Sequence, residues 1–282
     1  MVGSRTLKRR IRSAKNIAQI TKAMQMVAAA KMKKAQAAAM AGKPYAAKIA
    51  EAVAEFASTL DSITHPLFQK YPKASKTLVL LVSTSKGLCG GLNTNLFRNV
   101  TSWFVGDNHT YIIIGKKGRN FALRTKAAIL ADFSDQDTSD IVGALATLVV
   151  EEYSKGIYKE VWIAYNEFIS ALRYEPRQLQ ILPFELPTPS VQEKKEARQF
   201  VVEPSEEQVV SLLIPHYLET QVRRSLLEAD ASEHSARMIA MKNATDNARN
   251  LMDVLSLEYN KIRQQQITFE IADMVTARMS GE

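Results

Sequence analysis

Apolar and small side chains recur at alternating steps of three and four residues near the beginning of the chain. The stripe with this spacing consists of Leu7, Ile11, Ala14, Ala18, Thr21, Gln25, Ala28, Met32 and Ala35. A second stripe on a neighbouring face consists of Ile17, Ile20, Met24 and Val27. Steps of three and four are typical of a coiled-coil seam, so the pattern predicts a long helix over residues 4–60. Gly42 and Pro44 are expected to kink or briefly interrupt this helix.

The last part of the chain repeats this pattern more strongly. Neither proline nor glycine occurs between His216 and Ser280. The seam in this part consists of Leu227, Ala231, His234, Met238, Met241, Thr245, Ala248, Met252, Leu255, Tyr259, Ile262, Gln266 and Phe269. Strict alternation over this length predicts a second coiled-coil helix. Pro204 is a candidate for its first turn, and Pro215 is expected to bend it near its start.

Short apolar runs alternate with helical patterns in the middle of the chain. The predicted strands cover residues 77–83, 110–115, 127–130, 160–168 and 178–186. The predicted helices cover residues 93–104, 116–123 and 140–155. Strands that alternate with helices predict an α/β domain with a largely parallel, Rossmann-like sheet.

The chain is thus predicted to have three parts. These are an N-terminal coiled-coil helix over residues 1–60, an α/β domain over residues 76–190, and a C-terminal coiled-coil helix over residues 205–282. The charged stretch Pro187–Pro204 is predicted to be a linker or exposed loop. Neither terminal seam has a partner inside the α/β domain, so we expect the two helices to pair with each other as an antiparallel coiled coil. Rods of this kind usually do mechanical or spacing work.

Charge is distributed unevenly along the chain. The net charge is +8, yet residues 1–60 alone hold twelve lysines or arginines and only Glu51 and Glu55 as acids. Such a basic helix attracts acidic partners, which include nucleic acid, a membrane surface and an acidic protein surface. The single cysteine, Cys89, excludes an intrachain disulfide.

The stretch Ser83–Asn93 is rich in glycine and lies between a predicted strand and a predicted helix. A phosphate-binding loop would occupy this place in an α/β fold. The stretch matches neither the P-loop pattern nor the dinucleotide-binding pattern, so we favour a tight turn over a nucleotide site. The four histidines are scattered without ligand spacing, and Cys89 is expected to be a packed side chain rather than a reactive thiol. The residues therefore indicate no catalytic, cofactor-binding or metal site.

Three classes of function remain open on these patterns. The first is a non-catalytic mechanical protein built on the coiled coil. The second is a protein that binds nucleic acid through the basic residues 5–48, although no aromatic side chain for base stacking precedes Tyr45. The third is a Rossmann-like enzyme that uses the Ser83–Asn93 loop. The architecture favours the mechanical class.

Four motifs in the chain resemble one known family, the gamma subunit of the bacterial-type rotary ATP synthase. They are Arg12–Ile17 with Ile20–Met32, the turn Gly87–Asn93, the run Ala236–Ala248, and the run Tyr259–Ile271. They are long, occur in the family's order and spacing, and extend the resemblance over essentially the whole chain. The end of the chain departs from the family pattern, since Phe269 stands where a glutamine is usual and the last residues lack the common apolar, small-residue tail.

The resemblance implies a non-catalytic rotor shaft of a proton-translocating ATP synthase. It implies an antiparallel coiled coil inside a ring of three alpha and three beta subunits, which carry the catalytic sites. It also implies contacts with the epsilon subunit and the membrane c-subunit ring, at the cytoplasmic face of the bacterial plasma membrane. Neither nucleic acid nor a directly bound nucleotide is expected.

The resemblance also implies roles for individual residues. Lys22 and Met24 look like the family's coupling residues, which face the lever of the beta subunit. Three residues near the C-terminus, Arg263, Gln264 and Thr268, resemble those that hydrogen-bond to the surrounding ring, as does Arg237 further from that end. Phe200–Glu203 falls where the family approaches the epsilon subunit and the membrane rotor.

Overall fold

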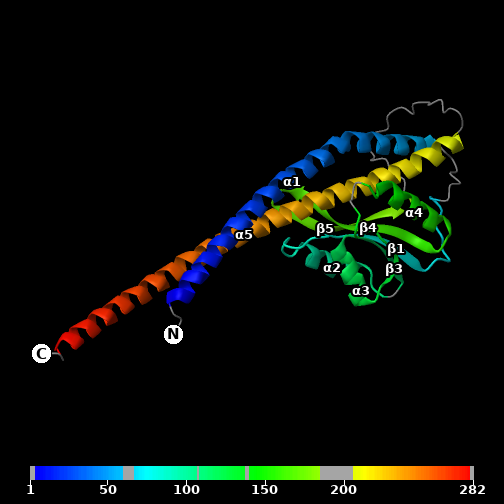
Figure 1. Ribbon diagram of the computed structural model, residues 1–282. Coiled ribbons are helices and arrows are strands. Elements are labelled where there is room, and N and C mark those ends of the chain that lie inside the picture. The colour runs from blue at the N-terminus through cyan, green and yellow to red at the C-terminus, as the bar shows by residue number, and fades with distance from the viewer. Residues whose placement is uncertain (1–3, 60–66, 107, 137–139, 185–205, 280–282) are drawn as a thin grey trace. The chain divides into compact units, whose positions relative to one another are not determined.

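The computed structural model describes residues 4–59, 67–106, 108–136, 140–184 and 206–279 (Figure 1). A long helix, α1 (Ser4–Thr59), opens the chain, and a longer one, α5 (Glu206–Met279), closes it. The chain divides into two compact units, of which unit 1 takes in residues 1–29 and 237–282, and unit 2 takes in residues 30–236. The predicted fold class, two long terminal helices with an α/β sheet between them, is confirmed.

Unit 2 contains a five-stranded sheet in the order β3-β2-β1-β4-β5. The strands are β1 (Lys76–Val82), β2 (His109–Ile114), β3 (Ala128–Asp132), β4 (Tyr158–Ser170) and β5 (Arg173–Leu182). Neighbouring strands from β3 to β4 pair in parallel, and β5 alone pairs antiparallel, as a hairpin with β4. The predicted largely parallel sheet is therefore correct, although β5 begins and ends earlier than the pattern suggested.

Helices cover both faces of this sheet. One face packs against α2 (Leu92–Trp103) and α3 (Lys116–Thr125), whose apolar side chains share a core with alternate residues of β1 and β2. The other face packs against α4 (Val142–Ser154) and the first part of α5, which contributes Ile214, Leu218, Val222 and Leu226 to the larger core. Because water reaches neither face, β1 and β2 read as continuous apolar runs rather than alternating ones.

Unit 1 is a coiled coil of the beginning of α1 and the end of α5, which lie side by side (Figure 1). Every residue of the α1 seam predicted within this unit is buried or half-buried, with alanines at most of the fully buried positions. The hydroxyls of Thr21 and Thr245 are 2.7 Å apart and fix the antiparallel register. Equal steps from that contact place Ser4 opposite Ile262, so α5 has no α1 partner beyond Ile262.

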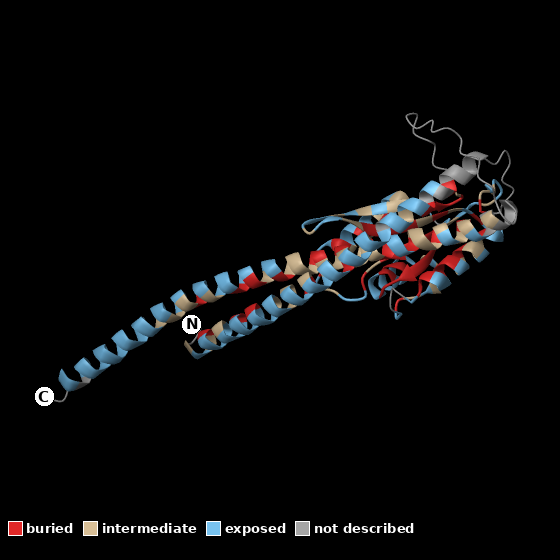
Figure 2. Ribbon diagram, turned by 90° about the horizontal axis from the view of Figure 1, so that it is seen from above, coloured by how far each residue is buried: buried red, intermediate tan, exposed pale blue. Residues whose placement is uncertain are grey.

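The seam of α5 therefore ends earlier than its sequence pattern predicts. The pattern continues through Gln266 to Phe269, yet both residues are exposed, Phe269 by 70%. Figure 2 shows the buried positions along the paired helices giving way to exposed ones at the C-terminal end of α5. The physical reason is that a seam buries side chains only where a second helix is present.

The prediction allowed either a kink or a brief interruption at Gly42 and Pro44. Helix α1 runs without a break through both residues, so no interruption occurs there. A proline inside a helix removes one backbone hydrogen bond and costs about 3 kcal/mol. On the far side of Pro44, Ile49 and Val53 are buried in the larger core of unit 2. This packing offsets the cost of the proline, since helices in proteins depend more on tertiary contacts than on propensity. Helix α5 likewise continues through Pro215.

Candidate functional site

The glycine-rich loop after β1 lies at the carboxyl edge of the parallel strands, where α/β proteins bind ligands. It is packed tightly against the loop after β2. A Cβ atom on Gly115 would lie 2.1 Å from the carbonyl oxygen of Ser83, and Gly115 has φ +89°, so only glycine fits there. The Gly118 amide donates to Ser83 Oγ (2.7 Å) and the Lys117 amide to the Thr84 carbonyl (3.0 Å). These amides at the start of α3 are therefore already hydrogen-bonded within the protein.

The same loop is closed internally by Asn93. Its Nδ2 atom donates to Thr84 Oγ1 (2.8 Å), and its Oδ1 atom accepts from the Thr84 amide (3.2 Å). Cys89 is buried in a small cluster with Leu92 and Ala236, the last of which belongs to α5. Helix α5 thus packs against the loop at Cys89. The loop is a tight turn, and Cys89 is a packed side chain.

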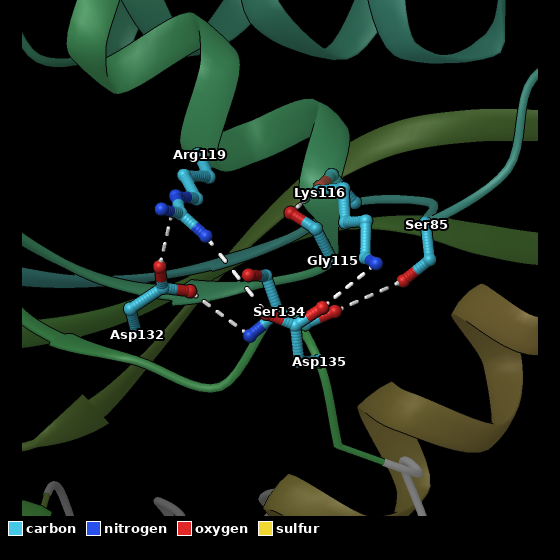
Figure 3. A network of polar contacts seen from close by, with 8 residues as sticks. Ser85, Gly115, Lys116, Arg119, Asp132, Ser134 and Asp135 are labelled. Atoms are coloured by element: carbon cyan, nitrogen blue, oxygen red, sulfur yellow. Dashed lines mark hydrogen bonds and ion pairs between the residues drawn. The ribbon is translucent and has the colours of Figure 1, made fainter.

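Charged side chains at this edge are paired with one another (Figure 3). Lys116 Nζ lies 2.7 Å from Asp135 Oδ1, and Arg119 Nε lies 3.3 Å from Asp132 Oδ2. The hydrogen bond from Lys116, followed by its positive charge, lowers the pKa of Asp135. Asp132 also accepts a hydrogen bond from the Ser134 amide (2.9 Å). The network links the loops after β2 and β3, and its ion pairs are largely solvent-exposed, so each adds little stability.

Metal-ligating side chains do not gather anywhere in the part of the chain that the structure describes: no group of three or more His, Cys, Asp or Glu residues there is placed to hold an ion. Nor does any helix within those residues have both the length and the apolar character to cross a membrane.

The coiled coil carries the residues that the family resemblance singled out. Lys22 is exposed on α1, where its Nζ atom donates to Gln25 Oε1 (3.3 Å), and Met24 is half-buried. On α5, Arg263 and Gln264 are exposed, and the Thr268 hydroxyl donates to the Gln264 carbonyl one turn earlier (3.0 Å).

The structure groups some of these six residues and separates others. Arg263, Gln264 and Thr268 lie together on the exposed end of α5, whereas Arg237 is half-buried at the other end of the α5 segment in unit 1. Lys22 and Met24 lie two positions apart on α1 and so point in different directions. Phe200–Glu203 lies outside the described residues.

Large apolar side chains are exposed on both helices of the coiled coil. The second stripe of α1 includes Ile17, Ile20 and Val27, which are 49–60% exposed. At the end of α5 every described side chain from Arg263 onward is exposed, and the large apolar ones there are Ile267, Phe269, Ile271, Met274, Val275 and Met279. Soluble monomers seldom expose contiguous apolar surface of this kind, which is typical of sites that contact another protein.

A buried polar stripe on α5 escaped the sequence analysis. Ser225, Glu228, Ser232 and Ser235 face the interior of unit 2 rather than solvent. Their spacing of three and four residues is visible in the sequence, but polar side chains at that spacing normally mark the solvent face of a helix.

Comparison with known proteins identifies the family. The family model described as ATP synthase matches residues 3–280. The ATP synthase gamma chain of Moorella thermoacetica is 41% identical over 280 residues and that of Desulfitobacterium hafniense 39% identical over 280 residues, with 98% of each chain covered in both cases. The chain belongs to the ATP synthase gamma-chain family. It is accordingly a non-catalytic, central-stalk rotor subunit.

Solved structures agree with the gamma-chain assignment. The central stalk and c-ring structure of the Tetrahymena thermophila mitochondrial ATP synthase contains a chain that is 26% identical, with a TM-score of 0.58, covering 80% of this chain and 99% of that one. A chain in the rotor of the Euglena gracilis mitochondrial ATP synthase is 20% identical with a TM-score of 0.67 over 94% of this chain and 98% of that one, which supports the fold.

Proposed function

We propose that this gamma chain turns inside a ring of three alpha and three beta subunits and couples proton flow to ATP synthesis or hydrolysis at the beta-subunit sites. Its α/β unit would contact the epsilon subunit and the c-subunit ring at the cytoplasmic face of a bacterial plasma membrane, so the protein would be peripheral to that membrane. The shaft needs no cofactor, and it binds neither nucleic acid nor nucleotide directly. The similar chain of the Tetrahymena thermophila mitochondrial ATP synthase belongs to a structure of the central stalk with the c ring, which supports these partners.

The observation that carries this proposal is the unpartnered end of α5. Beyond Ile262 no helix among the described residues pairs with α5, yet α5 continues to Met279 with exposed apolar side chains. Exposed apolar surface of this extent is expected to be covered by another protein. A single helix is narrow enough to be surrounded by other subunits, and the ring of alpha and beta subunits would surround this end of α5.

Charge on α1 supports the same arrangement. Lys8, Arg9, Arg12, Lys15 and Lys22 are all exposed on the part of α1 in unit 1. An acidic lever on the beta subunits would attract this basic face, and attraction between exposed charges steers association without locking the two surfaces together. This reversibility suits a shaft that must turn.

The six predicted contact residues have distinct roles in this proposal. Lys22 and Met24 would meet the beta-subunit lever. Arg237, Arg263, Gln264 and Thr268 would hydrogen-bond to the ring as the shaft passes. Neutral amide and hydroxyl groups such as Gln264 and Thr268 make hydrogen bonds without leaving an unpaired charge when the contact breaks.

Reconstitution tests the proposal. The purified chain is mixed with alpha and beta subunits from the same source, and the mass and ATPase activity of the product are measured. We expect one copy bound to three alpha and three beta subunits, with ATPase activity that the chain alone lacks. Absence of a complex, together with salt-sensitive binding of nucleic acid by residues 5–48, would contradict the proposal and favour the nucleic-acid alternative.

A matched pair of threonine variants tests the contact residues in the same complex. Thr268 and Thr276 are both exposed on α5, and each hydroxyl donates to the carbonyl four residues earlier, Gln264 (3.0 Å) and Ala272 (2.8 Å). We expect Thr268→Val to change the ATPase rate per complex by about 2- to 10-fold, as loss of one hydrogen bond implies, and Thr276→Val to leave it unchanged. Equal rates for the two variants would remove Thr268 from the proposed contacts.

A further inference from the structure

A stripe of four polar residues on α5 is buried in unit 2. Ser225, Glu228, Ser232 and Ser235 are separated by steps of three, four and three residues, with exposed fractions of 1%, 6%, 0% and 0%. Burial of polar side chains costs free energy unless new hydrogen bonds replace those to water. The hydrogen-bond partners of this polar stripe therefore indicate what it does.

Glu228 is held at both oxygens of its carboxylate. The Tyr165 hydroxyl donates to Oε2 (3.2 Å), and Arg224 Nε donates to Oε1 (2.9 Å). Tyr165 belongs to β4, so this carboxylate connects α5 to the sheet. Burial, and then the negative charge of Glu228, raise the pKa of Tyr165, which keeps its hydroxyl protonated as a donor.

The two serines further along α5 bond to the backbone of the β4–β5 hairpin. Ser232 Oγ donates to the Asn166 carbonyl (2.9 Å), and Ser235 Oγ donates to the Ala171 carbonyl (2.7 Å). Asn166 lies opposite Pro176 of β5, and proline has no N–H group to donate across the ladder. Ser232 thus donates to the carbonyl of a residue that lies opposite a proline.

Apolar contacts between α5 and the sheet leave the orientation of the helix less tightly fixed. The free energy gained by burying apolar surface does not depend on direction. A helix that rotated or slid slightly would therefore keep much of its buried apolar surface. Hydrogen bonds weaken steeply when their angle or distance changes. Rotation of α5 by one residue position, about 100°, would carry both serine hydroxyls away from their carbonyls.

We propose that this polar stripe transmits torque between the sheet of unit 2 and helix α5, because its hydrogen bonds fix the rotational and axial register of α5 on the β4–β5 hairpin. The proposal rests on the proposed function of the chain as a rotor shaft. It assigns to Ser232, Ser235 and Glu228 a positioning role rather than contact with any other subunit.

The test uses the assembled ATP synthase in membrane vesicles with the double variant Ser232→Ala and Ser235→Ala. ATP hydrolysis and ATP-driven proton uptake are measured on the same vesicles while the opposing proton gradient is raised. Loss of these two hydrogen bonds is expected to leave hydrolysis largely unchanged but to lower the protons pumped per ATP by about twofold or more at the steepest gradient. The reason is that the register slips only under load.

Two control variants separate this role from a general loss of stability. Ser256→Ala removes a serine hydroxyl from the same helix, but Ser256 Oγ donates to its own helix at the Met252 carbonyl (2.7 Å). Ile113→Val trims a fully buried side chain of the core on the opposite face of the sheet. Both controls are expected to keep the normal ratio of protons to ATP at every gradient.

The outcomes distinguish the torque-transmitting role of the polar stripe from the proposed function of the chain as a rotor shaft. If the double variant exchanges the amide hydrogens of residues 165–175 faster but pumps as many protons per ATP as both controls, the stripe is only structural and the proposal is wrong. If the double variant does not assemble, Glu228→Gln, which keeps the shape of the side chain, is expected to show the same loss under load. If the unmodified complex pumps no protons with ATP, the proposed function fails first.

Discussion

The two units differ in the size of the side chains that they bury. Unit 2 buries large aliphatic and aromatic side chains between sheet and helices, among them Leu78, Ile112, Leu145 and Tyr153, all at most 2% exposed. Unit 1 buries mainly small side chains, with alanines such as Ala14, Ala18 and Ala28 along its seam. Stabilisation rises with the apolar area buried, so unit 2 gains far more per residue than unit 1.

The difference in buried area indicates that the two units obtain their stability from different contacts. Unit 2 has a core of its own on both faces of the sheet. Unit 1 keeps large apolar side chains outside, including Ile20, Val254 and Leu257, each at least 60% exposed. Small seam residues bring the two helix axes close and make a narrow rod. Part of the apolar surface of the rod is left for a surrounding protein to cover.

The largest expected effect is loss of stability in unit 2. Leu145→Ala removes a fully buried side chain of α4 and is expected to lower the free energy of unfolding of unit 2 by about 2–5 kcal/mol. Tryptophan fluorescence during urea unfolding measures it, because both tryptophans, Trp103 and Trp162, lie in unit 2. Leu123→Ala, at a side chain that is 60% exposed on α3, is the matched control. Equal losses for both variants would contradict the assignment of the core.

An intermediate effect is expected in the seam of unit 1. Ala28→Leu places a large side chain where the residue is 2% exposed, and this overpacking is expected to cost about 1–3 kcal/mol. Hydrogen exchange of amides in residues 4–29 and 237–262 measures it. Ala23→Leu introduces the same side chain at an exposed position of the same helix and should have little effect, since alanine and leucine have similar helix propensities. Equal tolerance of both changes would show that α1 and α5 do not approach closely there.

The smallest effect concerns the surface network at the edge of the sheet. Because Lys116 lowers the pKa of Asp135, the pair stabilises the folded protein when Asp135 is ionised, and this contribution is lost as the pH falls through the lowered pKa. Lys116→Met is therefore expected to lower the melting temperature slightly near neutral pH, by an amount that shrinks only as the pH falls below the ordinary aspartate pKa of 3.8.

Lys117→Met is the matched control for this pH dependence. It removes the same charge from the same turn of α3 but leaves the contact between Lys116 and Asp135 in place. Melting temperatures of the two variants are compared across the pH range. A constant difference between them would mean that Asp135 does not contribute in the way that the lowered pKa implies.

Sequence reasoning succeeded where the determining physics is local. The run Lys76–Val82 is almost entirely apolar, and such a run between helical patterns indicates a strand of a covered, parallel sheet. The tight turn after β1 was favoured because its glycines match no phosphate-binding pattern, and the structure gives its reason in the contact between Gly115 and Ser83. By contrast, the interruption predicted at Pro44 is absent, because packing of Ile49 and Val53 outweighs the local cost of proline.

The sequence by itself determined the periodicities of this protein: two seams with steps of three and four, the strands between them, and the motifs that place the chain in its family. Only the tertiary structure decided which faces those periodicities bury. It ended the α5 seam at Ile262, where α1 begins at Ser4, and it turned the polar residues from Ser225 to Ser235 inward, where β4 and β5 supply their partners. The reason is that periodicity is a property of a single helix, whereas burial depends on residues far away in the chain.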